Sequence, residues 1–285
     1  MDCPLYQLDI GDNKDMYYKW NAEDYHKNSS EQLRLAKEFI AKLGLKGDER
    51  ILDIGCGDGK ITAELAALVP NGSVLGIDCS EDMVNFASSK FPPTDFPNLR
   101  FQHEDARNLH FENEFDSIVS FTCLHWIADH TPVLEGIRNS LKPDGKIQLL
   151  FVGKTEQNTC TRGFIEKMIG IDKWGKYFEK FMSAPFGLYE ADEYKDLLEY
   201  AGLKSNRVEA ITTNMIFEGK EEFKGLIRTT WLPLLASVPE NLHQELIDAL
   251  AETYIECNPM DKEGFVYMPI VKLEVEARKV ETSHS

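Results

Sequence analysis

Short apolar runs alternate with helix-like segments along the first half of the chain. Five runs have the length and composition of buried strands, at 50–55, 73–78, 99–106, 115–121 and 146–152. Apolar residues at helical spacing mark four further segments, at 29–43, 60–69, 80–91 and 131–141. Strands and helices that alternate in this way favour a parallel sheet with helices on both faces. We therefore expect a doubly wound α/β core whose main part is residues 46–154.

The second half of the chain is more helical and more aromatic. Mainly helical segments are expected at 155–187, 190–203 and 220–257, and strands at 207–217 and 265–279. The sequence predicts that 189–217 and 263–279 complete the α/β core. It also predicts a helical lid and cap from the remaining segments, at 1–45, 155–188 and 218–262. The aromatic stretch 174–189 suits either a packed cap helix or a hydrophobic pocket.

A glycine-rich turn follows the first predicted strand. It reads Asp-Ile-Gly-Cys-Gly-Asp-Gly over 53–59, and it lies at the carboxyl end of the strand, where open α/β sheets bind ligands. The triplet alone is a weak signal, because any tight strand-to-helix turn can use glycine. Two acidic residues strengthen the ligand interpretation. Asp53 could meet a cationic group, and Asp78, at the end of the second strand, could accept hydrogen bonds from both hydroxyls of a ribose.

Composition and charge exclude several classes of function. The chain has 48 acidic and 31 basic residues, a net charge of −17, which repels phosphate backbones and anionic membranes, so no nucleic-acid partner is expected. No apolar run approaches the ~20 residues of a membrane span, and the N-terminus lacks the basic region of a signal peptide. Six scattered cysteines without a Cys-x-x-Cys pair indicate a reduced, cytoplasmic protein with no metal site.

The motifs, taken in order, resemble the Rossmann-like S-adenosylmethionine-dependent methyltransferases. The resemblance rests on the glycine turn, on Asp78, on "HEDARNL" at 103–109 and on "LKPDGK" at 141–146. A looser likeness to the trans-aconitate and juvenile hormone acid methyltransferases rests on three stretches, at 19–32, 120–130 and 223–235. The resemblance implies a seven-stranded sheet with six parallel strands and an antiparallel last strand. It also implies S-adenosyl-L-methionine as the cofactor and a cap over the acceptor site.

The resemblance assigns roles to particular residues. Asp105 would accept from the adenine amino group beside the Ala106 amide, and Asp53 and Asp78 would meet the amino-acid tail and the ribose. The full set expected at the cofactor is Trp20, Tyr25, Gln32, Asp53, Gly55, Cys56, Gly57, Gly59, Asp78, Cys79, Met83, Asp105, Ala106 and Phe121. The residues expected at the methyl acceptor are His125, Trp126 and Arg228. Ordinary packing or helix-surface exposure is the alternative for the aromatic residues, Gln32 and Arg228.

The expected acceptor is a small organic or amphipathic acid, methylated on a carboxylate oxygen. A carboxylate is already ionised at neutral pH, so the site needs a cation or hydrogen-bond donors to orient it rather than a general base. Arg228 could supply a bidentate clamp. Other oxygen, nitrogen and carbon acceptors remain open, as does the oligomeric state. Two alternatives are an NAD-dependent oxidoreductase, which also uses an acid after the second strand, and a cofactor-binding protein without turnover.

Overall fold

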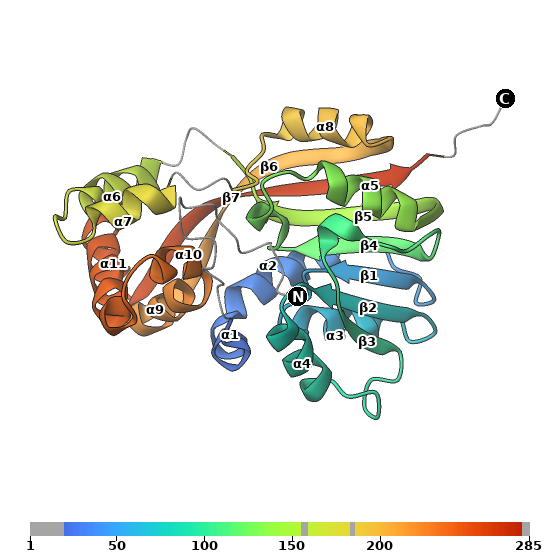
Figure 1. Cartoon of the computed structure of the whole chain (residues 1–285), viewed down its shortest axis with the longest axis horizontal. Helices are drawn as coiled ribbons and strands as arrows, with labels where there is room; N and C mark the ends of the chain where they lie inside the picture. The colour runs from blue at the N-terminus through green and yellow to red at the C-terminus, as the bar shows by residue number, and fades with distance from the viewer. Residues whose placement is uncertain (1–19, 155–158, 183–185, 281–285) are drawn as a thin grey trace. The chain divides into compact units, whose positions relative to one another are not determined.

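Seven strands form one mixed sheet in the order β3-β2-β1-β4-β5-β7-β6 (Figure 1). The computed structural model describes residues 20–154, 159–182 and 186–280. Strands β1 to β5 pair in parallel, and β7 runs antiparallel to β5. The strands are β1 (Arg50–Ile54), β2 (Ser73–Asp78), β3 (Leu99–His103), β4 (Phe115–Phe121), β5 (Leu141–Val152), β6 (Leu203–Glu218) and β7 (Phe265–Lys279). The expected α/β fold, with six parallel strands and an antiparallel last strand, is confirmed.

The chain divides into two compact units, and both β6 and β7 contribute residues to each of them. The sheet unit holds the described residues of 32–154, 186–211 and from 272 onward, and the helical unit holds those of the rest. Helices of the sheet unit are α2 (Ser30–Ile40, from its third residue), α3 (Lys60–Leu68), α4 (Glu81–Lys90), η2 (Ala106–Asn108), η3 (Leu124–Trp126), α5 (Thr131–Ser140) and α8 (Ala191–Tyr200). Helices of the helical unit are α1 (Ala22–Asn28), α6 (Thr159–Ile169), α7 (Gly175–Met182), α9 (Gly219–Thr230), α10 (Leu232–Ala236), η4 (Glu240–Leu242) and α11 (His243–Cys257).

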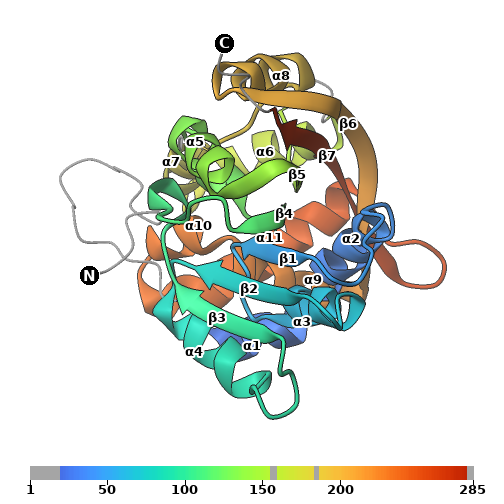
Figure 2. The ribbon, with the colours of Figure 1, turned by 90° about the vertical axis from the view of Figure 1, so that its right-hand side faces the viewer.

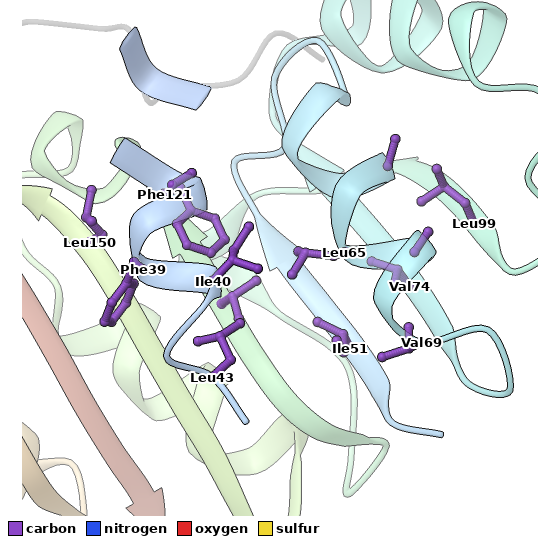
Figure 3. Packing of buried hydrophobic residues seen from close by; sticks show 14 residues of the cluster. Phe39, Ile40, Leu43, Ile51, Leu65, Val69, Val74, Leu99, Phe121 and Leu150 are labelled. Carbon is purple, nitrogen blue, oxygen red and sulfur yellow. The ribbon is translucent and has the colours of Figure 1, made fainter. Parts of the chain in front are cut away.

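The sheet unit buries apolar side chains on both faces of its strands. On one face, Phe39 of α2 meets Phe121 of β4 edge to face, within a cluster to which α3 and Leu150 of β5 also contribute (Figure 3). The next residue of β5, Phe151, instead contacts Tyr194 of α8. Side chains alternate between the two faces along a strand, so α8 and α2 cover opposite faces. Helix α5 also lies across the sheet from α2 and α3 (Figure 2).

The helical unit has an aromatic core of its own. Phe164 of α6 meets Phe178 of α7 and Tyr254 of α11 edge to face, and each of these three side chains is at most 2% exposed. Trp174, just before α7, is also buried. The N-terminal part of the aromatic stretch 174–189 therefore packs inside this unit, as a cap helix would. Phe186 and Tyr189, at its other end, belong to the sheet unit, and 183–185 lie outside the described residues.

The element boundaries follow local side-chain chemistry. Ser80 caps α4 as expected, since its hydroxyl accepts from the Met83 amide. The strand expected at 99–106 ends at His103, because Asp105 caps η2. One helix was expected from residue 29, but a separate helix, α1, precedes it and is capped by Asn21. Residues 32–45, grouped with the lid from sequence, lie in the sheet unit, and 1–19 and 155–158 lie outside the described residues.

Candidate functional site

The glycine turn between β1 and α3 is shaped mainly by contacts within the protein. All three glycines have positive φ, at +74° for Gly55, +52° for Gly57 and +78° for Gly59. Residues other than glycine rarely adopt this region of backbone conformation. A Cβ on Gly55 would lie 2.2 Å from the Cys123 sulfur. A Cβ on Gly59 would lie 2.7 Å from the Phe101 ring. Backbone conformation and close packing therefore require glycine at 55 and 59 without any ligand.

Asp53 is a carboxylate enclosed in the sheet. Its side chain is 1% exposed and accepts a 2.7 Å hydrogen bond from the hydroxyl of Thr62 on α3. Burial raises the pKa of Asp53 from an ordinary value of 3.8 to about 7, and the charge of Asp78 raises it further, while the Thr62 hydrogen bond opposes the shift. A cationic ligand group beside Asp53 would favour its ionised form.

Asp78 connects the ends of two strands. Its carboxylate accepts from the Gly57 amide at 3.0 Å and from the Ser80 amide at 2.8 Å. Burial raises its pKa, which these two backbone hydrogen bonds oppose. The neighbouring Cys79 is buried and its carbonyl contacts the His103 ring at 2.8 Å. Each Asp78 oxygen accepts one of these amides and has a further lone pair, so the carboxylate can still accept hydrogen bonds from hydroxyl groups.

The residues expected around an adenine have mixed environments. Asp105 accepts a bidentate pair from the Arg107 guanidinium, with an Nη2 to Oδ2 distance of 2.6 Å, and it also accepts from the Arg107 amide. Its carboxylate is therefore already strongly bonded within its own turn. The buried side chains of Ala106, Met83 and Cys56 supply apolar surface, and burial raises the pKa of the Cys56 thiol. Phe121 is buried in the core against α2.

The loop after β4 begins with a strained residue. Thr122 has φ of +52°, which is unusual for a β-branched side chain. Three residues on, the His125 and Trp126 rings contact each other in a tilted arrangement, with centroids 5.0 Å apart, and Trp126 also meets Phe186. The His125 Nδ1 is buried without a hydrogen-bond partner, and burial lowers the pKa of this imidazole to about 3. A neutral, polar ring is thus held in a strained loop, and strained loops of this kind concentrate at functional sites.

Two residues that the sequence analysis did not single out hold this loop in place. His130, which is fully buried, contacts the Leu124 carbonyl through Nε2 at 2.8 Å. The Gly187 amide donates to the His125 carbonyl at 3.0 Å, and a Cβ on Gly187 would lie 1.9 Å from the Ile127 carbonyl oxygen. Neither contact is visible in local periodicity, although a second histidine five residues after His125 was available as a signal.

Gln32 is the other described residue of the sheet unit with a buried side-chain polar atom that has no hydrogen-bond partner. It lies in the first turn of α2 and is 5% exposed, and its Oε1 atom is buried without a hydrogen-bond partner. An unsatisfied buried polar group costs free energy, so such groups are rare unless something else completes them. Among the described residues of the sheet unit, Gln32 and His125 are therefore the two whose buried side-chain atoms a ligand could satisfy.

Trp20, Tyr25 and Arg228 belong to the helical unit. Trp20 and Tyr25 meet edge to face, with centroids 5.5 Å apart. The Arg228 guanidinium donates two hydrogen bonds to Asp24 of α1, at 2.6 and 2.8 Å, and this pairing raises the pKa of Arg228 and lowers that of Asp24. Arg228 therefore ties α9 to α1. No cluster of three metal-ligating side chains occurs in the described part of the chain, and no described helix is long and apolar enough to cross a membrane.

Several known proteins similar in sequence to this chain are named as methyltransferases. The family described as "Methyltransferase domain" matches residues 51–145. Protein 235L of Invertebrate iridescent virus 6, named as a methyltransferase, is 30% identical over 71% of this chain and 73% of its own. Juvenile hormone acid O-methyltransferase of Bombyx mori is 29% identical over 83% and 85% of the two chains. Trans-aconitate 2-methyltransferase of Methylobacterium nodulans is 24% identical over 91% and 98%.

A solved structure shares the fold. Phosphoethanolamine N-methyltransferase 2 of Haemonchus contortus, in complex with S-adenosyl-L-methionine, superposes with a TM-score of 0.59 at 19% identity, over 91% of this chain and 57% of the other. The expectation of an NAD-dependent oxidoreductase finds no support among these relatives. The extended match to protein 235L, together with the seven-stranded sheet, establishes that this chain belongs to the S-adenosylmethionine-dependent methyltransferase family.

Proposed function

We propose that this protein uses S-adenosyl-L-methionine to methylate a carboxylate oxygen of an amphipathic organic acid. The observation that carries the proposal is the neutral His125 imidazole, whose buried Nδ1 has no partner, on the loop after β4. Relatives named for juvenile hormone acid and for trans-aconitate support a carboxylate acceptor.

The acidic residues around the glycine turn fit this cofactor. When bound, S-adenosyl-L-methionine supplies an electrophilic methyl group on a cationic sulfonium. Asp53, Asp58 and Asp78 are each at most 8% exposed and create a negative field at the carboxyl ends of β1 and β2. In our proposal Asp53 faces the ammonium of the amino-acid tail, and Asp78 accepts from the ribose hydroxyls while it holds Gly57. Asp105 would contribute its remaining lone pairs to the adenine, beside Ala106.

The properties of His125 suit a carboxylate acceptor. With a pKa near 3 the ring is a poor general base at neutral pH, but a carboxylate needs none because it is already ionised. A neutral imidazole whose Nδ1 carries the hydrogen can donate to one carboxylate oxygen and leave the other to react. Gln32 can donate through its amide nitrogen, and Trp126 can exclude water. Orientation and water exclusion are what a direct displacement requires.

The basic residues near the candidate positions favour an acid with a single carboxylate. Each already has a carboxylate partner in the protein, in the pairs Arg107–Asp105, Lys60–Asp58 and Arg228–Asp24. With a net charge of −17, the chain would repel a tricarboxylate more strongly than a monocarboxylate. We therefore infer a monocarboxylic acid with an apolar body as the acceptor.

Calorimetry and a methyl-transfer assay test the two halves of this proposal separately. S-adenosylhomocysteine should bind and NAD should not. Radiolabelled S-adenosyl-L-methionine should then label monocarboxylic acids of graded chain length, juvenile hormone acid among them, more than trans-aconitate. His125→Ala should abolish labelling while S-adenosylhomocysteine still binds. Labelling of amines or phenols alone would contradict the carboxylate assignment, and binding without any labelling would indicate a protein that retains only the cofactor site.

A further inference from the structure

His130 is a buried imidazole with both ring nitrogens engaged. Its side chain is 0% exposed, with Nε2 lying 2.8 Å from the Leu124 carbonyl and Nδ1 lying 3.1 Å from the Tyr194 hydroxyl. A carbonyl can only accept, so Nε2 must carry the hydrogen, and Nδ1 must then accept from the tyrosine hydroxyl. The two partners therefore select one tautomer of a neutral ring.

Aromatic side chains enclose this ring. The centroid of the His130 ring lies 5.3 Å from that of Phe151 in β5, 4.7 Å from that of Tyr189, which precedes α8, and 5.6 Å from that of Tyr194 in α8. Burial lowers the pKa of His130 to about 4, against the opposing effect of the Leu124 hydrogen bond. The contact with Leu124 is therefore made by a buried, closely packed ring just before α5 rather than by a surface side chain.

The bond from His130 acts directly on the loop that carries His125. Leu124 is the first residue of η3, and His125 follows it. Farther along the same loop, the Tyr189 hydroxyl donates to the Ala128 carbonyl at 3.0 Å and accepts from the His130 amide at 3.3 Å. The loop is thus fixed at Leu124, at Ala128 and at His130 itself, and the Gly187 amide holds the His125 carbonyl. The His130 ring supplies a side-chain contact to the residue directly before His125.

We propose that His130 is a positioning residue, whose Nε2–H holds the Leu124 carbonyl and thereby sets the place of the His125 ring for the acceptor. The consequence for catalysis rests on the function proposed above, whereas the positioning itself does not. A displacement of about 1 Å at a reacting centre can lower a rate by ~100-fold. Loss of this bond should therefore lower kcat far more than it changes cofactor affinity.

Two variants separate the hydrogen bond from the packing. His130→Phe keeps an aromatic ring but removes the donor, and His130→Gln restores an amide donor near the position of Nε2. His243→Phe is the matched control, because His243 contacts the Val238 carbonyl at the same 2.8 Å in the helical unit. For each variant we would measure kcat and KM with a monocarboxylic acceptor, calorimetric binding of S-adenosylhomocysteine, the melting temperature, and the imidazole signals of His125 in a long-range proton–nitrogen NMR spectrum.

The proposal predicts that kcat and the His125 signals change while cofactor affinity does not. His130→Phe should lower kcat by about 10- to 100-fold and shift the His125 signals, with S-adenosylhomocysteine affinity kept within about twofold. His130→Gln should recover most of both losses, and His243→Phe should change neither. The proposal is overturned if kcat, affinity and melting temperature fall together in both His130 variants, or if the His125 signals of His130→Phe match the wild type.

The NMR spectrum also separates this proposal from the proposed function. If the wild-type protein methylates no acid, the carboxylate assignment fails, yet the His125 signals still decide whether His130 holds the loop. If the wild type methylates acids and His130→Phe does so equally well, the function stands and the positioning role of His130 is rejected.

Discussion

The Thr62 hydroxyl donates a 2.7 Å hydrogen bond to Asp53, a carboxylate whose pKa is nevertheless raised to about 7 by its burial. In the unfolded chain Asp53 has an ordinary pKa near 3.8, so between about pH 4 and 7 only the folded protein holds this proton. Its contribution to stability is therefore fully present below pH 4 and is lost as the pH rises through 7. Ionised Asp53 destabilises the apoprotein at neutral pH.

Asp53→Asn should consequently raise the melting temperature of the apoprotein at pH 8 and weaken the binding of S-adenosylhomocysteine. In the wild type, affinity for S-adenosylhomocysteine should fall as the pH drops below 7, because protonation of Asp53 removes the charge that we propose faces the ligand's ammonium. Thermal unfolding and calorimetry across pH 5.5 to 8 check both directions. An Asp53→Asn protein that is less stable at pH 8, or a wild-type affinity that does not change with pH, would contradict the assignment.

Asp78 should contribute to both the fold and the cofactor site. Asp78→Ala leaves the half-buried amides of Gly57 and Ser80 without their acceptor, which costs about 1–3 kcal/mol of stability, and it removes the proposed ribose contacts. We expect S-adenosylhomocysteine affinity to fall by at least about 10-fold, since hydrogen bonds to charged groups are worth ~1.5–3 kcal/mol. Ser80→Ala, which removes only the α4 cap, is the control for stability loss alone. Equal affinities of the two variants would remove Asp78 from the ribose site.

Arg228 was expected to clamp the acceptor, but its guanidinium is bonded to Asp24. If its task is to hold α1 on α9, Arg228→Ala and Asp24→Asn should have the same effect on KM and kcat for the acid. We expect this matched outcome. A rise in KM for the acid in Arg228→Ala alone would instead assign the guanidinium to the acceptor, as expected from sequence.

Glu274 anchors a buried charge network in the sheet unit. Its side chain is 0% exposed and contacts Lys42, Arg207 and Lys272 at 2.9, 2.6 and 3.0 Å. Despite its burial, hydrogen bonds from these cations lower its pKa from 4.5 to about 2, so its stabilising contribution is present above pH 4.5 and is lost as the pH falls through 2.

Glu274→Gln leaves these cations without their shared partner and should cost about 3 kcal/mol of unfolding free energy at pH 7, with a smaller difference from wild type at pH 3. Denaturant titration at both pH values measures this. Glu276→Gln, at a more exposed position beside Arg207, is the matched control and should cost less than about 1 kcal/mol. Similar losses of unfolding free energy in the two variants would show that the burial of Glu274 does not increase its contribution to stability.

The backbone conformation of Thr122 should lower the stability of the folded protein. A β-branched residue at φ of +52° is strained by an amount on the order of 1 kcal/mol, whereas asparagine tolerates this region. Thr122→Asn should therefore raise the unfolding free energy by about 1 kcal/mol and leave S-adenosylhomocysteine binding unchanged. Asn113→Ala, at a φ of +51°, should destabilise the protein, because alanine tolerates this region less well than asparagine and also lacks the acceptor for Lys279. Destabilisation by Thr122→Asn would mean that the threonine side chain makes a contact that outweighs the strain.

The sheet was largely predictable because its signals are local. Strands β2, β4 and β7 have the bounds expected from runs of apolar or alternating residues, and Ser80 caps α4 as its sequence context suggests. Helix α1 was missed because its sequence carries few apolar residues, with Ala22 its one buried residue, and its partner α9 lies almost 200 residues away. Its place depends on tertiary packing that no short window contains.

The candidate site was predictable as a set of residue types but not as a set of contacts. The pairing of Asp105 with Arg107 is local, yet nothing in the sequence indicates that the Arg107 side chain turns back to bind the Asp105 carboxylate. The Arg228–Asp24 and His130–Tyr194 contacts join residues 204 and 64 positions apart. Roles that depend on such partners follow from the fold rather than from the motif.

The packing of Cys123 against Gly55, and of Phe101 and Ala87 against Gly59, bears on how this lineage can diverge. Selection for a folded chain alone would preserve these two glycines, even in a descendant that had lost all turnover. The glycine motif would then be retained in inactive paralogues after their activity had been lost. If the proposed roles of His125 and Gln32 hold, drift at these two positions would mark the loss of catalysis earlier than any change at the glycines, because the buried His125 Nδ1 and Gln32 Oε1 make no hydrogen bond within the described protein.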